Sequence, residues 1–224
     1  MLHDSCTEFS LKTLGILGGS FDPVHKGHIG LAKSVYQHCR LAELRLVPLC
    51  NPVHRQQPLA SVTQRVKMLQ MATAREPGLS VDEREITRAG QSYSIDTLRS
   101  FREEFPNSAL CLVMGMDAFT SLNSWREWQS IMDYAHILFT SRPGAELRIQ
   151  DKDLSKVYEA RRSEDVQDIH RSRAGVIYQV PAPELDISST EVRSMIAEGQ
   201  ELDAVLANEV ISFIRTEGIY HKHR

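Results

Sequence analysis

The sequence predicts an α/β fold with a doubly wound parallel sheet, and three observations support this. A short apolar strand at residues 14–17 runs into two adjacent glycines and then into a helix. Further short apolar runs alternate along the chain with segments whose apolar residues recur at helical spacing. A chain of 224 residues is also long enough to cover both faces of one sheet. Strands of a parallel sheet are continuously apolar because helices cover both of their faces.

The predicted elements alternate in the order that such a sheet requires. Strands are predicted at residues 14–17, 44–49, 79–86, 109–114, 135–140 and 175–180. Helices are predicted from Val24 or His25 to residue 39, over 61–75, from Ser94, within the charged surface segment 146–173, from Ser188, and over 202–219. A strand, helix and strand in sequence form a right-handed crossover, and ligands bind beyond the carboxyl ends of such strands. The glycine turn at residues 18–19 lies at such an end.

We expect one domain over residues 14–220, in which residues 187–219 form a short helical C-terminal part. Residues 1–13 and 221–224 are predicted to be tails. The four cysteines are scattered without paired spacing, which indicates free thiols in a reducing compartment. No apolar run approaches the length of a membrane span, and the polar, acidic start does not resemble a signal peptide. The expected compartment is the cytoplasm, with no membrane partner.

The net charge of −3 provides no basic field for nucleic-acid binding, so a small anionic substrate is expected instead. At Gly18 and Gly19 the missing side chains let a phosphate approach the backbone, and the following helix offers N–H groups and a positive dipole end. His25 and His28 are three residues apart and fall on one face of the first turn, where both can donate to that phosphate. Such a pair also occurs on solvated helix faces or in metal sites, but no cysteine or carboxylate cluster nearby completes a metal shell.

The full stretch, Gly-Gly-Ser-Phe-Asp-Pro-Val-His-Lys-Gly-His at residues 18–28, resembles the signature of the His-x-Gly-His nucleotidyltransferases, relatives of the class I aminoacyl-tRNA synthetases. This form of it is similar to bacterial nicotinate-mononucleotide adenylyltransferases, and the resemblance runs from about Leu14 to Tyr220. It implies a Rossmann-like fold and an enzyme of NAD biosynthesis that transfers AMP from ATP to nicotinate mononucleotide, giving nicotinate adenine dinucleotide and pyrophosphate. Alternatives are a related transferase for nicotinamide mononucleotide or pantetheine phosphate, and a non-catalytic nucleotide-binding regulator.

The resemblance also implies the residues on the ATP side of the site. Its catalytic residues would be His25, His28 and Arg193, and its ATP-binding residues Gly18, Gly19, Ser20, Phe21, Asp117, Arg142, Ile187, Ser188, Ser189 and Thr190. Asp117 is equally expected as a turn residue that caps the next helix. Ser188 and Glu191 fit an ordinary capping box, whose hydroxyls and N–H groups can also hold triphosphate oxygens. Magnesium is expected to enter with ATP, held by phosphate oxygens and water, without a metal site of the chain's own.

Nicotinate mononucleotide would bind to Asn51, His54, Arg55, Tyr93, Ser94 and Trp125. The loop at 51–58 departs from the family pattern because Val53 replaces a proline, and Arg55 taken alone is an ordinary loop charge. Ser94 is predicted to cap a helix whose open N–H groups would favour a carboxylate over an amide. Trp125 is expected to stack on the pyridine ring, whereas Trp128 is expected to be buried as helix packing.

Overall fold

The computed structural model describes residues 11–51, 57–140, 146–181 and 187–221, and within them seven strands form one parallel sheet. The strands are β1 (Thr13–Gly19), β2 (Glu43–Pro48), β3 (Leu79–Val81), β4 (Ala109–Gly115), β5 (His136–Thr140), β6 (Arg162–Ser163) and β7 (Ile177–Val180). Their order across the sheet is β3-β2-β1-β4-β5-β7-β6. The order reverses between β1 and β4, which confirms the doubly wound class and marks the crevice where such sheets bind ligands.

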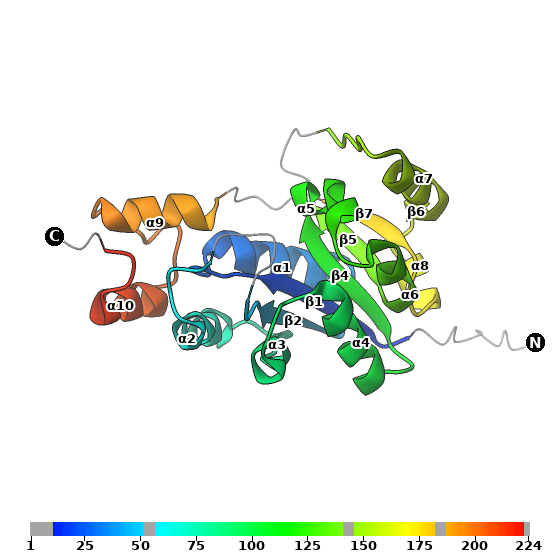
Figure 1. Ribbon diagram of the computed structural model, residues 1–224. Helices are drawn as coiled ribbons and strands as arrows, with labels where there is room; N and C mark the ends of the chain where they lie inside the picture. The colour runs from blue at the N-terminus through cyan, green and yellow to red at the C-terminus, as the bar shows by residue number, and fades with distance from the viewer. Residues whose placement is uncertain (1–10, 52–56, 141–145, 182–186, 222–224) are drawn as a thin grey trace, which may run out of the picture.

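Helices cover both faces of this sheet (Figure 1). They are α1 (Lys26–His38), α2 (Val62–Thr73), α3 (Arg84–Arg88), α4 (Ser94–Glu104), α5 (Met116–Thr120), α6 (Ile131–Tyr134), α7 (Lys152–Arg161), α8 (Asp168–Arg171), α9 (Ser189–Ala197) and α10 (Asn208–Glu217). Two short 3-10 helices, η1 (Leu122–Ser124) and η2 (Trp128–Ser130), follow α5. In Figure 1, α9 and α10 lie together beside α2 at one end of the molecule.

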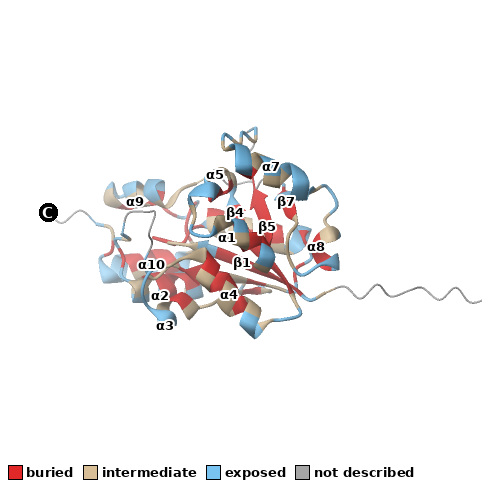
Figure 2. Cartoon of the chain, turned by 45° about the vertical axis from the view of Figure 1, so that its right-hand side comes forward, coloured by how far each residue is buried: buried red, intermediate tan, exposed pale blue. Residues whose placement is uncertain are grey.

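The core consists of two apolar clusters, one on each face of the sheet. Strand β1 shows the division, since Leu14 and Ile16 face the cluster under α4 and α6, whereas Leu17 faces the cluster under α1, α2, α9 and α10. Buried residues accordingly concentrate in the central strands and on the inward sides of the helices (Figure 2). Gly15 is required here, because a Cβ would lie 2.7 Å from the Leu41 side chain. The alternation of side chains along a strand thus fixes which helices each residue meets.

Several predicted boundaries were wrong, among them the following three. The strand predicted over 79–86 ends at Val81, because the Asp82 carboxylate accepts a hydrogen bond from the Arg84 N–H (3.0 Å) and turns the chain into α3. The predicted helix over 202–219 begins only at Asn208, after a turn in which the Leu202 carbonyl accepts from Val205 and Leu206. Within the predicted 1–13 tail, Thr13 instead belongs to β1.

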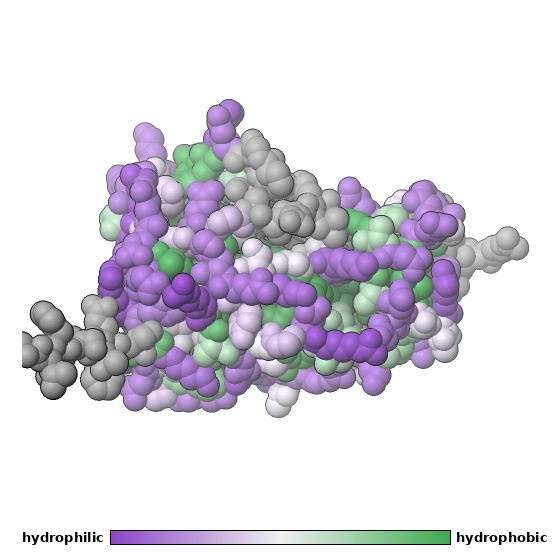
Figure 3. All heavy atoms as spheres, turned by 180° about the vertical axis from the view of Figure 1, so that it is seen from behind, coloured by the Kyte–Doolittle hydropathy of each residue, from purple (hydrophilic) through white to green (hydrophobic). Residues whose placement is uncertain are grey.

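The segment 146–173 contains the predicted surface helix as α7, and it also adds β6, which pairs in parallel with β7. Within the described residues, none of the helices combines the length and the apolar character needed to cross a membrane. Seen from behind, hydrophilic side chains are spread over the face shown in Figure 3, and hydrophobic groups appear in small patches between them.

Candidate active site

The carboxyl ends of β1 and β4 bring two predicted segments to the same edge of the sheet. Gly18 and Gly19 are the last two residues of β1, and Gly115 ends β4 next to it. Asp117 follows in the first turn of α5 and is exposed. Gly115 is the N-cap residue of that helix, so the alternative of Asp117 as the cap is wrong. The edge between β1 and β4 is therefore where both segments could meet one ligand.

The turn after β1 depends on a close contact between Gly19 and Phe21. A Cβ at Gly19 would lie 2.9 Å from the Phe21 ring, and Phe21 itself has a positive φ of 48° and is buried. The Phe21 ring also meets the His28 ring edge to face, with the two ring centroids 5.0 Å apart. The glycine at this position therefore admits the Phe21 ring against the backbone.

His25 and His28 cap the start of α1 for each other. His25 is the N-cap residue, its Nδ1 accepts from the His28 N–H (3.4 Å), and the His28 Nδ1 accepts from the His25 N–H (3.3 Å). The two rings stack with centroids 3.7 Å apart. An acceptor nitrogen carries no proton, so each neutral ring carries its proton on Nε2. The structure thus brings the two predicted catalytic histidines together in one defined tautomer.

Burial lowers the pKa of His25 to about 4, although the nearby Glu191 carboxylate opposes the shift. The imidazole is therefore neutral at pH 7. Gly27 sits between the two histidines, and a Cβ there would lie 3.0 Å from both His25 Nδ1 and Ile187 Cγ2. The glycine of the His-x-Gly-His pattern thus lets the segment before α9 approach the histidine pair.

At the start of α9 the predicted capping box is confirmed. The Ser188 side chain accepts from the Glu191 N–H (3.2 Å), and the Glu191 carboxylate accepts from both the N–H and the hydroxyl of Ser188 (2.7 Å each). The Ser189 hydroxyl donates to the Pro23 carbonyl (3.0 Å). The hydroxyls of Ser188 and Ser189 therefore donate to partners inside the protein, which leaves the helix N–H groups, the Thr190 hydroxyl and Arg193 as the donors for an anion.

Arg193 reaches back from α9 to the turn after β1. Its Nη1 donates to the Asp22 main-chain carbonyl (2.7 Å), and its Nη2 donates to the Thr190 hydroxyl (3.2 Å). The side chain is 25% exposed. A guanidinium has five N–H groups, so these two bonds still leave donors for a phosphate. Arg193 and the histidine pair are thus held on the same turn.

Arg65, a fully buried arginine in α2, was not predicted to belong to the site. Its Nη1 and Nη2 donate to the carbonyls of Ser20 and Leu49 (2.7 Å each), which joins the turn after β1 to the end of β2. Burial lowers its pKa, and the charge of Asp22 opposes this. One signal was present in the sequence, because Arg65 falls on the same helical stripe as the apolar residues Val66 and Leu69.

The end of β2 also meets the segment before α4. The hydroxyl of Ser92, which the sequence analysis did not single out, accepts from the N–H groups of Cys50 (2.9 Å) and Asn51 (3.3 Å). The Ser92 N–H in turn donates to the Asn51 carbonyl (3.0 Å). Asn51 thus lies next to the segment with Tyr93 and Ser94, the residues with which it is predicted to bind nicotinate mononucleotide. The predicted residues His54, Arg55 and Arg142 lie outside the described residues.

Ser94 is the first residue of α4 and not its cap, so that prediction was wrong by one residue. Tyr93 is the N-cap residue, and its side chain makes no capping bond. The guanidinium carbon of Arg126 lies 4.7 Å from the centre of the Tyr93 ring, which brings the segment around Trp125 to the start of α4. No side chain of the N-cap residue accepts from the first N–H groups of α4.

Trp128 is not buried as predicted. Both Trp125 and Trp128 are half-buried and pack on the apolar cluster under α4 and α6. Trp128 is the first residue of η2, which has 3 residues. Trp125 directly follows η1.

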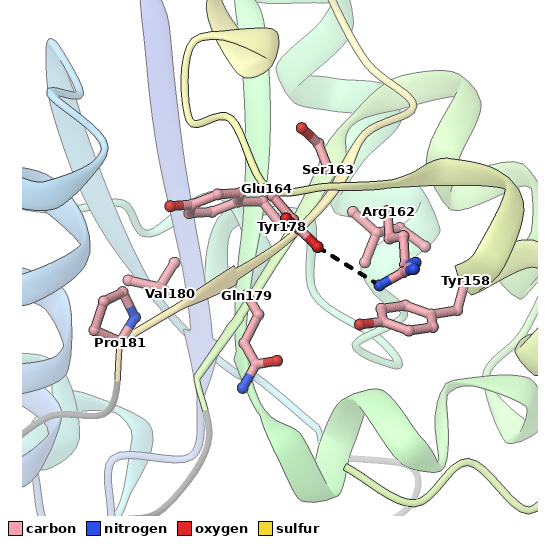
Figure 4. A pocket seen from close by; sticks show the side chains of 9 residues that line it. Tyr158, Arg162, Ser163, Glu164, Tyr178, Gln179, Val180 and Pro181 are labelled. Atoms are coloured by element: carbon pink, nitrogen blue, oxygen red, sulfur yellow. Dashed lines mark ion pairs between the residues drawn. The ribbon is translucent and has the colours of Figure 1, made fainter. Parts of the chain in front are cut away.

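Three other features of the described chain add no residue to this site. A pocket of about 370 Å³ beside β6 and β7 contains no predicted site residue, and its Arg162 and Glu164 form an ion pair with each other (3.9 Å; Figure 4). In the described part of the chain no three His, Cys, Asp or Glu side chains lie close enough to hold a metal ion. Burial raises the pKa of the Cys39 thiol to about 12, which makes it unreactive.

The sheet order, the glycine turn and the histidine pair define a nucleotide-binding α/β protein, and comparison with known families agrees. Residues 16–195 match the model of the cytidylyltransferase-like family. The chain belongs to this family and is therefore a nucleotidyltransferase. Enzymes of this class generally use a divalent metal ion with ATP.

Within that class, the chain is similar to curated bacterial proteins over almost its whole length. It is 39% identical to the "Probable nicotinate-nucleotide adenylyltransferase" of Aeromonas salmonicida, covering 92% of this chain and 96% of that protein. It is 41% identical to the protein of the same name from Marinobacter nauticus, covering 92% and 95%. The chain is thus a member of the nicotinate-nucleotide adenylyltransferases, as its motifs predicted.

Among solved structures, the fold matches "Plasmodium falciparum nicotinic acid mononucleotide adenylyltransferase complexed with NaAD" with a TM-score of 0.70. The sequences are 17% identical, and the match covers 93% of this chain and 97% of that one. At this identity the similarity establishes the fold, which confirms the Rossmann-like prediction.

Proposed function

We propose that this enzyme transfers the AMP group of ATP to nicotinate mononucleotide, giving nicotinate adenine dinucleotide and pyrophosphate in NAD biosynthesis. The observation that supports it most is the reciprocal cap of His25 and His28, which fixes two Nε2–H donors at the start of α1, just after the turn that follows β1. The names of the bacterial relatives, and the dinucleotide bound to the Plasmodium enzyme, support the choice of substrates.

In this proposal a phosphate oxygen of the mononucleotide attacks the α-phosphorus of ATP. The new O–P bond forms as the bond between the α-phosphorus and the bridging oxygen breaks, and pyrophosphate leaves with that electron pair. The phosphate is already a nucleophile, so the protein needs only to align the reactants and stabilise the charge of the transition state. His25 and His28 donate to the transferring phosphoryl group, and Arg193 stabilises the departing pyrophosphate.

The remaining predicted residues divide between the ATP side and the mononucleotide side of the site. Gly18, Gly19, Ser20 and Phe21 would line the ATP phosphates, with Asp117 near the ribose or phosphates and the segment 187–190 contributing its N–H groups. Asn51, Tyr93, Ser94 and Trp125 would bind the mononucleotide. Magnesium would enter as MgATP, held by phosphate oxygens and water.

For localisation we propose the cytoplasm, which the free thiols of Cys39, Cys50 and Cys111 support.

The substrate assignment is tested by measuring pyrophosphate release with each candidate acceptor at saturating MgATP. Nicotinate mononucleotide should have a kcat/KM about 30-fold to about 1,000-fold above that of nicotinamide mononucleotide, because a carboxylate accepts from the uncapped N–H groups of α4, whereas an amide NH₂ faces donors. ATP without an acceptor is the control. Equal values or a preference for the amide would overturn the choice of acceptor, and faster reaction with pantetheine phosphate would favour that alternative.

A further inference from the structure

The last described residues of the chain return to the turn after β1. Tyr220 follows α10, and its hydroxyl donates to Asp22 Oδ1 at 2.6 Å across 198 residues of sequence. Gly218 and Tyr220 both have a φ of 65°, so the chain reverses direction directly after the helix. The Tyr220 ring packs on the apolar cluster under α1, α9 and α10. The hydroxyl is therefore carried to Asp22 by an anchored ring.

Asp22 connects three separate segments through one buried residue. Its side chain is 6% exposed and accepts from the N–H groups of Leu59 (2.8 Å) and Ala60 (3.0 Å) as well as from Tyr220. Its main-chain carbonyl accepts from Arg193 Nη1 at 2.7 Å. The same Nη1 lies 3.8 Å from Asp22 Oδ2, too far for a hydrogen bond. Arg193 thus contacts the carbonyl of Asp22 while its charge lies near the carboxylate.

Removal of the Tyr220 hydroxyl would leave Asp22 Oδ1 with a single donor in a buried place. A buried carboxylate that lacks donors is unfavourable, and the Arg193 guanidinium, whose Nη1 lies 3.8 Å from Asp22 Oδ2, is close enough to compensate for the lost donor. A small rotation would bring Arg193 from the main-chain carbonyl onto the carboxylate, where its charge would be neutralised. Burial of Tyr220 raises the pKa of its phenol, so the hydroxyl stays protonated and remains a donor.

We infer that Tyr220 is a positioning residue for adenylyl transfer: its hydroxyl completes the bonding of Asp22 and so keeps the Arg193 guanidinium directed at the departing pyrophosphate. This inference rests on the proposed role of Arg193.

The first test is Tyr220→Phe, which removes only the hydroxyl. The variant should lower kcat about tenfold and weaken product inhibition by pyrophosphate by a similar factor, while KM for nicotinate mononucleotide stays within about twofold. Tyr178→Phe is the matched control, because the Tyr178 hydroxyl bonds His38 Nε2 (2.9 Å) at the other end of α1. A purely structural loss would lower the melting temperature in either variant without weakening pyrophosphate inhibition, and that result for Tyr220→Phe would overturn the inference.

The second test is a double-mutant cycle with Arg193→Ala. If Tyr220 acts through Arg193, the Tyr220→Phe change should have no further effect on kcat in the Arg193→Ala background. Suppose instead that Arg193→Ala lowers kcat and that Tyr220→Phe lowers it by the same further factor in that background. This result would overturn the positioning role of Tyr220 and leave the proposed site intact. An Arg193→Ala enzyme with unchanged kcat would instead contradict the proposed role of Arg193 itself, and the inference with it.

Discussion

The two halves of the candidate site are held in place by different forces. The transfer half, residues 19–28 with the start of α9, is connected through Asp22, His25 and Arg65, which are 5%, 5% and 1% exposed. The base half, residues 93–99 with residues 125–127, is connected through ion pairs of Asp96, Arg99, Arg126 and Glu127, whose side chains are 32% to 52% exposed. Buried hydrogen bonds thus join the parts of the first half. In the second half, where Tyr93 and Trp125 also pack on the apolar cluster, the polar contacts are ion pairs that water can screen.

This difference indicates which part of the site sets rate and which sets substrate choice. A buried polar group that loses its partner costs the full desolvation penalty, whereas exposed ion pairs contribute little and weaken with salt. The donors for the transferring phosphoryl group must be placed accurately, and they lie in the half with the costly bonds. Variants of the transfer half should therefore lower kcat, and variants of the base half should raise KM for the mononucleotide.

The largest effect is expected for His28→Ala in the transfer half. The change removes an Nε2–H donor together with one half of the reciprocal cap of α1, so kcat should fall about a hundredfold or more, with a smaller change in KM for ATP. Steady-state pyrophosphate release measures both. His38→Ala in the last turn of the same helix is the control and should retain turnover. Unchanged turnover in His28→Ala would remove the histidine pair from the mechanism.

Next in size is Trp125→Ala in the base half. Stacking of a base on an aromatic ring is worth about 1 to 3 kcal/mol, so KM for nicotinate mononucleotide should rise about tenfold or more, while KM for ATP changes little. Trp128→Ala is the matched control, since both indoles are half-buried against the same cluster. The control should lower the melting temperature and leave KM unchanged. Loss of stability with unchanged KM in both variants would withdraw the stacking role.

The two halves also differ in how far the sequence alone predicted them. The first strand, the histidine pair and the Ser188 capping box depend on local patterns, namely an apolar run with a glycine turn, a three-residue spacing and a capping sequence, and these three lie where they were predicted. Local rules failed where a side chain overrode the pattern, as when Asp82 ended β3 and began α3.

Contacts between distant segments were beyond sequence reasoning. No periodicity indicates that Tyr220 meets Asp22, or that Ser92 bonds the main chain after β2, because such contacts are set by how the helices pack on the sheet. Arg65 lies between these cases. Its place on an apolar helix face is visible in the sequence, but the two carbonyls that it joins belong to Ser20 and Leu49, the residues that follow β1 and β2.

The smallest effect is expected for Glu127→Gln, which breaks the ion pair with Arg99 (2.5 Å) in the base half. The hydrogen bond from Arg99 lowers the pKa of Glu127, so the carboxylate is charged at neutral pH and the pair is formed. Because both side chains are exposed, KM for nicotinate mononucleotide should rise only about twofold at about 0.05 M salt. At about 0.5 M salt the variant and the unmodified enzyme should have the same KM, because salt screens the ion pair in the unmodified enzyme. Asp153→Asn, which breaks the exposed pair with Lys156 in α7, should leave KM unchanged at both salt concentrations. A rise in KM that persists at high salt, or a fall in kcat, would show that Glu127 acts through packing or through the transfer half, and the contrast between buried bonds for rate and screened charges for substrate binding would then fail.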